Sequence, residues 1–123
     1  MNVCARPLLG KVEQDPTIAN NVLMLTPFAA DSEDAGVKSF VEAYQAAYNA
    51  TPDQFAAGSY DGVYVLKAVI EKAGSTSGAA MAQAMTEITV EGITGSMTWT
   101  ADGNTSKAAS AILYFDGVGK LFG

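Results

Sequence analysis

The stretch DQFAAGSYDGVY, residues 53–64, separates two segments of helical periodicity, and the rest of the chain is arranged around it. Its small residues allow the backbone to approach neighbouring segments closely, and Phe55, Tyr60 and Tyr64 supply ring surface. This composition predicts a buried crossing between two packed units, with a pocket beside it. An ordinary loop between helices, whose aromatic side chains fill the core, is the simpler alternative, and the residues taken alone favour it.

The segment before this stretch has the spacing of an amphipathic helix. From Gly36 onward, apolar residues recur at intervals of three and four, and polar residues fall on the other face. The acidic residues among 31–34 precede this helix, where they favour the positive end of its dipole. They lack the glycine and the terminal bidentate acid of a calcium loop, so no metal site is predicted there. Asn49 and Pro52 are expected to end the helix.

Two further helices are predicted after the stretch. The first presents an apolar face as far as Ala73, and Gly74 is the expected residue that ends it. Asp61 is its candidate N-cap, with a buried acid as the alternative. A turn at residues 75–78 then leads into a shorter helix.

Strand patterns occur near both ends of the chain. The continuous apolar run at residues 21–26 predicts a buried strand of a parallel sheet. Residues 96–100 alternate polar with apolar, and residues 111–115 form another strand before a tight turn at 116–117. Residues 1–19 show no periodicity and are predicted to be irregular. The order strand, three helices and two strands predicts an α/β fold with an antiparallel ending.

Composition excludes several classes of function. With 123 residues, of which 49% are hydrophobic, the chain is one domain or part of one. Its net charge of −6 argues against nucleic acid and anionic membranes as partners. The absence of histidine, with Cys4 as the lone cysteine, excludes a Ser-His-Asp triad and makes zinc unexpected. No catalytic residue, metal or cofactor is predicted, and neither a membrane span nor a signal peptide is recognisable.

Three parts of the chain, in this order and spacing, carry a family resemblance: residues 22–28 with 40–48, residues 55–63, and residues 92–99 followed by Asp102, Gly103 and Lys107. The first part, residues 22–28 with 40–48, resembles the last strand and helix of the second lobe in one family of two-lobed proteins. Residues 55–63 resemble the return crossing of that family and the helix that follows it. The third part resembles the family's terminal strand-and-turn signature. That family is the type I periplasmic binding proteins, in the branch that binds leucine, isoleucine and valine. The similarity is to the C-terminal part of these two-lobed proteins.

The resemblance implies a partial type I periplasmic-binding-protein (Rossmann-like) fold. Residues 1–19 would be an irregular N-terminal segment and residues 20–51 a remnant of the second lobe. Residues 52–59 would be a hinge crossing, and residues 60–123 the C-terminal part of the first lobe. The implied function is that of a substrate-binding component of an ABC-type amino acid transport system, which works with membrane subunits outside the cytoplasm and closes its cleft on a branched-chain or similar solute.

Four residues are the candidate ligand site. The resemblance places Phe55 at the aromatic position that packs on an aliphatic side chain, and Tyr60 lies close enough to add a hydroxyl. Thr26 and Phe28 follow the strand at its C-terminal end, where open α/β sheets place ligands.

A non-binding module that associates with itself is the alternative function. A strand such as residues 22–26 needs neighbours, and a second copy would supply them, through domain swapping for example. A homodimer is therefore expected. An enzyme is disfavoured because histidine and cysteine chemistry is missing.

Overall fold

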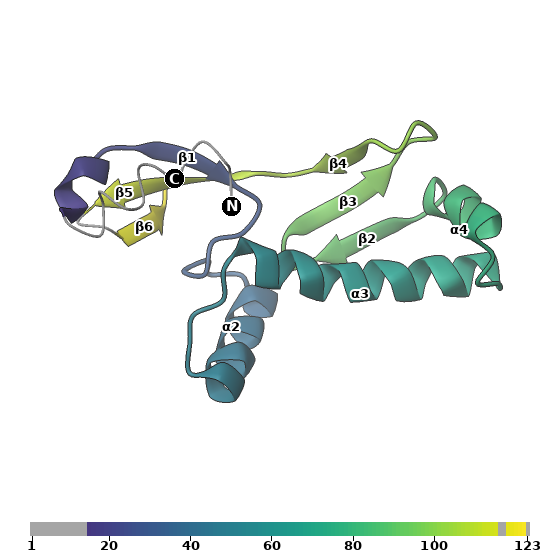
Figure 1. The fold of residues 1–123 in the computed structure, drawn as a ribbon, viewed down its shortest axis with the longest axis horizontal. Helices are drawn as coiled ribbons and strands as arrows, with labels where there is room; N and C mark the ends of the chain where they lie inside the picture. Colours follow the sequence, from purple (N-terminus) through teal and green to yellow (C-terminus); the bar gives the residue numbers. More distant parts are fainter. Residues whose placement is uncertain (1–14, 116–117, 123) are drawn as a thin grey trace.

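The computed structural model describes residues 15–115 and 118–122, which form helices and two antiparallel sheets (Figure 1). A short 3₁₀ helix, η2 (Pro16–Ala19), opens the described part of the chain. The helices are α2 (Ala35–Tyr48), α3 (Gln54–Ala73) and α4 (Gly78–Met85). The strands are β1 (Leu23–Thr26), β2 (Thr89–Gly92), β3 (Gly95–Trp99), β4 (Thr105–Lys107), β5 (Ser110–Phe115) and β6 (Val118–Leu121).

The two sheets lie at opposite ends of an elongated molecule (Figure 1). One has the order β1-β5-β6 and the other the order β2-β3-β4, and all described pairs are antiparallel. The chain leaves the second sheet through β4 and returns to the first as β5, so residues from both sides of the helices share one sheet. This arrangement confirms the predicted mixed α/β class.

The first strand differs from its prediction. β1 is not a buried strand between parallel neighbours: it pairs antiparallel with β5, with Leu23 opposite Leu113. The side chains of Leu23 and Leu25 are 56% and 73% exposed. A run of apolar residues indicates that a strand can be covered on both faces, but it does not specify the direction of its partner.

The predicted crossing at residues 52–59 is largely helix. Asp53 caps α3, because its Oδ1 accepts hydrogen bonds from the backbone N–H groups of Phe55 (3.0 Å) and Ala56 (2.9 Å). The connection between α2 and α3 is therefore only residues 49–53. The expectation that Asp61 is the N-cap is wrong, since Asp61 lies inside α3 and is buried.

The predicted helix ends are confirmed. Asn49 and Gly74 adopt the left-handed conformation, with φ of 52° and 59°. Asp34, from the acidic segment, caps α2 by accepting hydrogen bonds from Gly36 N and Val37 N. The strands predicted at 96–100 and 111–115 are also confirmed. β2 and β4 were not predicted, and the predictions for residues 1–14 and 116–117 fall outside the described residues.

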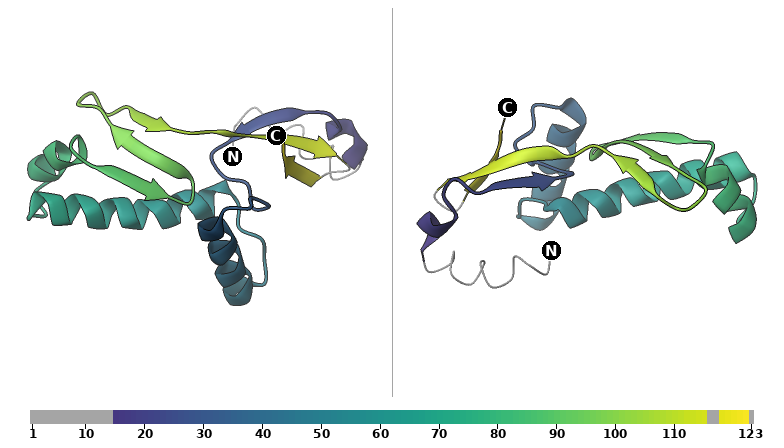
Figure 2. Two further views of the ribbon diagram at one scale, coloured as in Figure 1. Left: turned by 180° about the vertical axis from the view of Figure 1, so that it is seen from behind. Right: turned by 90° about the horizontal axis from the view of Figure 1, so that it is seen from above.

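Two apolar clusters hold the elements together. α3 lies along β2 and β3 in both views of Figure 2, and α2 packs against its first turns. The cluster at the α2–α3 junction contains Phe28, Val37, Phe40 and Ala57. The cluster between α3, α4 and the second sheet contains Val65, Val69, Val90 and Met97.

Candidate functional site

The end of β1 meets the start of α3. Thr26 is 5% exposed, and its hydroxyl donates to the carbonyl oxygen of Phe28 (2.9 Å) and lies 3.3 Å from Gln54 Oε1. The backbone N–H of Phe28 in turn donates to Thr26 Oγ1 (3.3 Å). Gln54 is the first residue of α3 and directly precedes Phe55. Thr26 therefore connects the first sheet to the turn of helix that carries Phe55.

A row of aromatic rings connects Phe28 to Tyr60. Phe28 meets Phe40 edge to face, with ring centroids 5.9 Å apart, and Phe40 lies 4.9 Å from Tyr60. Tyr60 continues the row to Tyr64, 5.0 Å away. Phe40, on α2, is thus the ring that joins two of the predicted site residues.

The four predicted site residues lie around one junction, but they differ in accessibility. Phe55 is 52% exposed and Tyr60 40% exposed, so both present ring surface to solvent. Thr26 and Phe28 are buried. In this conformation a solute can touch Phe55 and Tyr60, while Thr26 and Phe28 support the backbone and the ring behind them.

The hydroxyls of Tyr60 and Tyr64, one helical turn apart, lie 3.2 Å from each other. The hydrogen bond with Tyr64 is the main cause that raises the pKa of Tyr60 above its ordinary value, followed by partial burial and by the nearby charges of Tyr64 and Asp61. The protonated phenol is therefore the form that the fold favours. Any stability that this shift contributes is present below the ordinary phenol pKa and is lost as the pH rises through the raised value.

We expect Tyr64→Phe to lower the pKa of Tyr60 towards the usual tyrosine value of about 10. The variant removes both the hydrogen bond and the neighbouring phenolate charge. The change is measured by ultraviolet titration of tyrosinate, with Tyr60→Phe used to assign the transition and Tyr48→Phe as the exposed control. An unchanged Tyr60 transition in Tyr64→Phe would contradict the role given to this hydrogen bond.

Asp61 serves the protein rather than a solute. Its carboxylate accepts hydrogen bonds from the backbone N–H groups of Ile93 and Thr94, both at 2.9 Å, and from the Thr94 hydroxyl. A Cβ atom at Gly92 would lie 2.4 Å from Asp61 Oδ2, so the hairpin approaches α3 as closely as only glycine permits. Asp61 therefore fixes the β2–β3 turn to α3.

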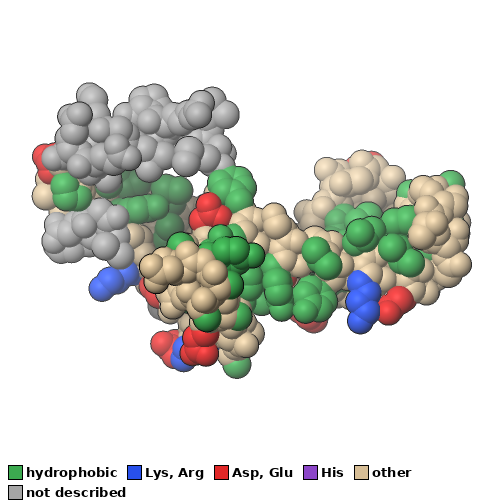
Figure 3. All heavy atoms as spheres, turned by 60° about the horizontal axis from the view of Figure 1, so that its bottom comes forward, with side chains coloured by type: hydrophobic (Ala, Val, Ile, Leu, Met, Phe, Trp, Pro, Cys, Tyr) green, Lys and Arg blue, Asp and Glu red, His purple; other side chains and the backbone are tan. Residues whose placement is uncertain are grey.

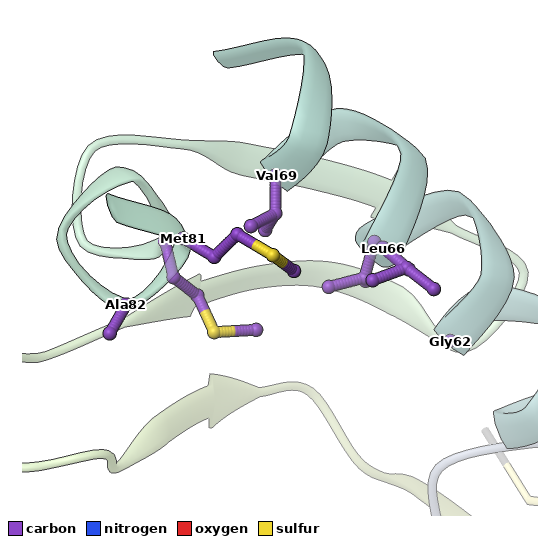
Figure 4. A pocket seen from close by; sticks show the side chains of 7 residues that line it. Gly62, Leu66, Val69, Met81 and Ala82 are labelled. Atoms are coloured by element: carbon purple, nitrogen blue, oxygen red, sulfur yellow. The ribbon is translucent and has the colours of Figure 1, made fainter. Parts of the chain in front are cut away.

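A separate apolar groove of about 290 Å³ lies between α3 and α4 (Figure 4). Its walls are formed by Gly62, Leu66, Val69, Met81 and Ala82, among others. These side chains carry no charge and no hydrogen-bonding group, so they cannot orient the amino and carboxylate groups of an amino acid. The groove is distinct from the junction that holds Phe55.

Other site chemistries find no support in the part of the chain that the structure describes. Residues 15–115 and 118–122 contain no group of three or more His, Cys, Asp or Glu side chains able to hold a metal ion. Within the same residues, every helix is too short or too polar to cross a lipid bilayer.

Three contributors to the junction were not among the predicted site residues: Phe40, Gln54 and Tyr64. The Tyr60–Tyr64 pair has helical spacing, but the helix was expected to begin at Asp61, which left Tyr60 outside it, whereas α3 begins at Gln54. Gln54 meets Thr26 across 28 residues of sequence, and Phe40 fits an ordinary core stripe. These two contacts leave no local signal.

Comparison with known proteins agrees with the fold. A model of the periplasmic binding protein family matches residues 11–118. No curated protein matches the chain. Among solved structures, the branched-chain amino acid transporter substrate-binding protein LivJ from Streptococcus pneumoniae, in complex with isoleucine, is 31% identical with a TM-score of 0.70. An ABC transporter substrate-binding protein from Desulfitobacterium hafniense, in complex with Leu, is 22% identical with a TM-score of 0.80.

A third solved structure, an ABC transporter solute-binding protein from R. palustris in complex with benzoate, is 20% identical with a TM-score of 0.71. The match to the S. pneumoniae protein covers 90% of this chain and 33% of that protein. The corresponding shares are 96% and 40% for the D. hafniense protein, and 85% and 30% for the R. palustris protein. This chain therefore spans well under half the length of each of these three solved chains. The resemblance to substrate-binding proteins of branched-chain amino acid transporters is thus confirmed, as is the partial type I fold. The chain belongs to the periplasmic binding protein family.

Proposed function

We propose that this chain is part of the substrate-binding component of an ABC-type amino acid transport system, and that it supplies one wall of the ligand cleft. The observation that carries the proposal is the exposed aromatic surface of Phe55 and Tyr60 at the junction between β1 and α3. The family match and the solved relatives that bind Leu and isoleucine support it. Branched-chain or similar small amphipathic solutes are the proposed ligands.

The proposed binding step needs no covalent chemistry. An aliphatic side chain covers the half-exposed ring of Phe55, and the Tyr60 hydroxyl offers a polar contact beside it. Thr26 and Phe28 act from behind by fixing the start of α3 and the ring of Phe40. The chain has no proposed catalytic role and no proposed cofactor.

We place the division between lobes by sheet membership. The second lobe then contains β1, α2, β5 and β6, and the first lobe contains α3, α4 and β2–β4. This division differs from the expected one, in which all of residues 60–123 belonged to the first lobe, because β5 and β6 share a sheet with β1. Cleft closure would bend the connections at residues 49–53 and 108–109. The proposed partners are the transporter's membrane subunits, and the proposed location is outside the cytoplasm.

The contribution of Phe55 is testable in a chimera, in which this whole chain replaces the matching third of the S. pneumoniae LivJ protein. Phe55→Ala is expected to weaken isoleucine binding by about 1–3 kcal/mol, because the variant removes a buried aromatic contact. Isothermal titration calorimetry measures the change. Tyr48→Ala, which removes an aromatic side chain that is 69% exposed, is the matched control and should leave affinity unchanged.

Two outcomes would count against the proposal. Equal affinity of the Phe55→Ala and unmodified chimeras would remove Phe55 from the site. A chimera that unfolds cooperatively yet binds no aliphatic amino acid would contradict the function.

Self-association without ligand binding is the second candidate. The exposed Leu23 and Leu25 lie on β1, which is an edge strand of its sheet among the described strands, and a second copy could pair there. A dimer, domain-swapped or not, is the state that this candidate requires. Sedimentation of the chain as a folded monomer would contradict it.

A further inference from the structure

The hairpin between β3 and β4 carries a sequence pattern that the proposed function does not use. Asn104, Thr105 and Ser106 have the form Asn-x-Ser/Thr, in which the middle residue is not proline. An asparagine in this pattern accepts N-linked sugars in proteins that leave the cytoplasm. Three residues make a short pattern, so its meaning depends on whether the fold presents it to an enzyme.

The structure places this tripeptide at the surface. Residues 101–109 are all exposed, and β4 is an edge strand that pairs with β3 alone among the described strands. The tip of the hairpin lies at the outer end of the second sheet, away from α2 and from the first sheet (Figure 1). An enzyme can therefore reach the segment, and β4 can leave its sheet by giving up a single ladder of hydrogen bonds.

The fold also presents the asparagine and the hydroxyl together. The side-chain nitrogen Nδ2 of Asn104 donates to Asp102 Oδ2 (2.6 Å), and both residues are exposed. Asn104 directly precedes β4, in which Ser106 lies opposite Thr98. Because side chains two positions apart share a face of an extended segment, the Ser106 hydroxyl is expected on the same side as the Asn104 carboxamide.

A second tripeptide of the same form provides an internal comparison. Asn49, Ala50 and Thr51 follow α2, and Pro52 comes directly after them. Asn49 is the left-handed residue that ends the helix, and its backbone N–H donates to the carbonyl oxygen of Gln45 (2.8 Å). Thr51 Oγ1 accepts a hydrogen bond from Gln45 Nε2 (3.4 Å). This tripeptide therefore cannot extend without undoing the end of α2, whereas the one in the hairpin is free of that constraint.

The hairpin lacks the apolar surface that would bury it against another part of a protein. Exposed large hydrophobic side chains occur on α3, where Val63 and Leu66 are examples, and Figure 3 shows hydrophobic side chains gathered along α3 and towards α4. None of the large hydrophobic side chains exposed in the described part of the chain lies among residues 100–109. Burial is driven by apolar area, so the hairpin is expected to stay accessible in a longer protein of this fold.

We propose that Asn104 is an acceptor for an N-linked glycan. The donor is a sugar joined through its C1 atom to a pyrophosphate group, and the catalyst is an oligosaccharyltransferase. A bond forms between Asn104 Nδ2 and C1, while the bond from C1 to the pyrophosphate oxygen breaks and its electron pair leaves with the pyrophosphate. The Nδ2 proton passes to a base of the enzyme. The inference rests on the proposed location outside the cytoplasm and is independent of the ligand site.

Glycan transfer to the purified full chain tests the proposal without relying on solute binding. The folded chain is incubated with a single-subunit bacterial oligosaccharyltransferase and a lipid pyrophosphate-linked oligosaccharide, and intact mass with peptide mapping identifies the product. We expect one glycan per chain, on the peptide that contains Asn104. Asn104→Gln and Ser106→Ala should each lower transfer about tenfold or more, because each removes a required part of the acceptor. Asn49→Gln should change transfer by less than about twofold.

Two further samples complete the design. Ser106→Thr keeps the hydroxyl and should keep transfer, and a synthetic peptide of residues 99–109 represents the unfolded segment. Circular dichroism shows that the variants retain the helical fold. Three results would overturn the proposal. In the first, neither the chain nor the peptide is modified. In the second, the peptide is modified but the folded chain is not, so the fold hides Asn104. In the third, the glycan is found on Asn49 and not on Asn104.

Discussion

Replacing Asp61 with alanine is expected to lower the free energy of unfolding of the chain by about 3 kcal/mol. The backbone N–H groups of Ile93 and Thr94 both lose the acceptor at 2.9 Å that Asp61 provides, and Thr94 is only 3% exposed. A buried donor left without its partner costs about 1–3 kcal/mol. Urea denaturation measures the total, and hydrogen exchange of the Ile93 and Thr94 amides reports the local release of the hairpin.

Asp102→Ala is the matched control for Asp61. Asp102 also accepts hydrogen bonds from nearby side chains in a turn, those of Thr100 and Asn104, but it is exposed. Its replacement should leave the free energy of unfolding almost unchanged, because Asp102 lies on the surface. Equal effects of the two substitutions would show that Asp61 does not fix the hairpin to α3.

Phe40→Ala is the second large effect, with an expected loss of about 3–4 kcal/mol in the free energy of unfolding. Phe40 is 9% exposed and its ring contacts the rings of Phe28, Tyr44 and Tyr60. The substitution leaves a cavity in the cluster between α2 and α3 and removes the support of Tyr60. Denaturant unfolding measures the loss.

Tyr48→Ala serves as the control for Phe40. Tyr48 packs only at the outer end of the same row, 4.7 Å from Tyr44, and is 69% exposed. We expect its loss to cost less than about 1 kcal/mol. A Phe40→Ala variant no less stable than Tyr48→Ala would contradict the view that the ring row forms the core of the α2–α3 junction.

Local chemistry predicted most of the elements, and long-range contacts account for what it missed. Apolar spacing gave the three helices, and Asn49 and Gly74 marked helix ends because each favours the left-handed conformation. Asp61 was expected at a helix start because its side chain suits a cap, but Asp53 supplies that cap eight residues earlier. The real partners of Asp61 lie more than 30 residues away, at the β2–β3 turn.

The candidate site was predictable only in part. Phe55 was singled out because the family resemblance places an aromatic residue at this position, and Tyr60 because it lies close to Phe55; both are accessible in the structure. Thr26 and Phe28 were placed at the end of a parallel strand, whereas β1 pairs antiparallel with β5 and both side chains are buried. Their supporting position depends on Gln54 and Phe40, whose contacts with them arise from the tertiary fold.

Thermal unfolding with and without millimolar leucine, isoleucine and valine tests the central claim most directly, when the LivJ chimera and the chain alone are compared. The chimera should gain about 2.7 kcal/mol when the ligand is at about 100 times its dissociation constant, and its melting temperature should rise accordingly. The chain alone should show no shift, because Phe55 and Tyr60 form one wall without an opposing one. A folded chimera without a shift, or an equal shift in the chain alone, would contradict the claim that this chain supplies one wall of a shared cleft.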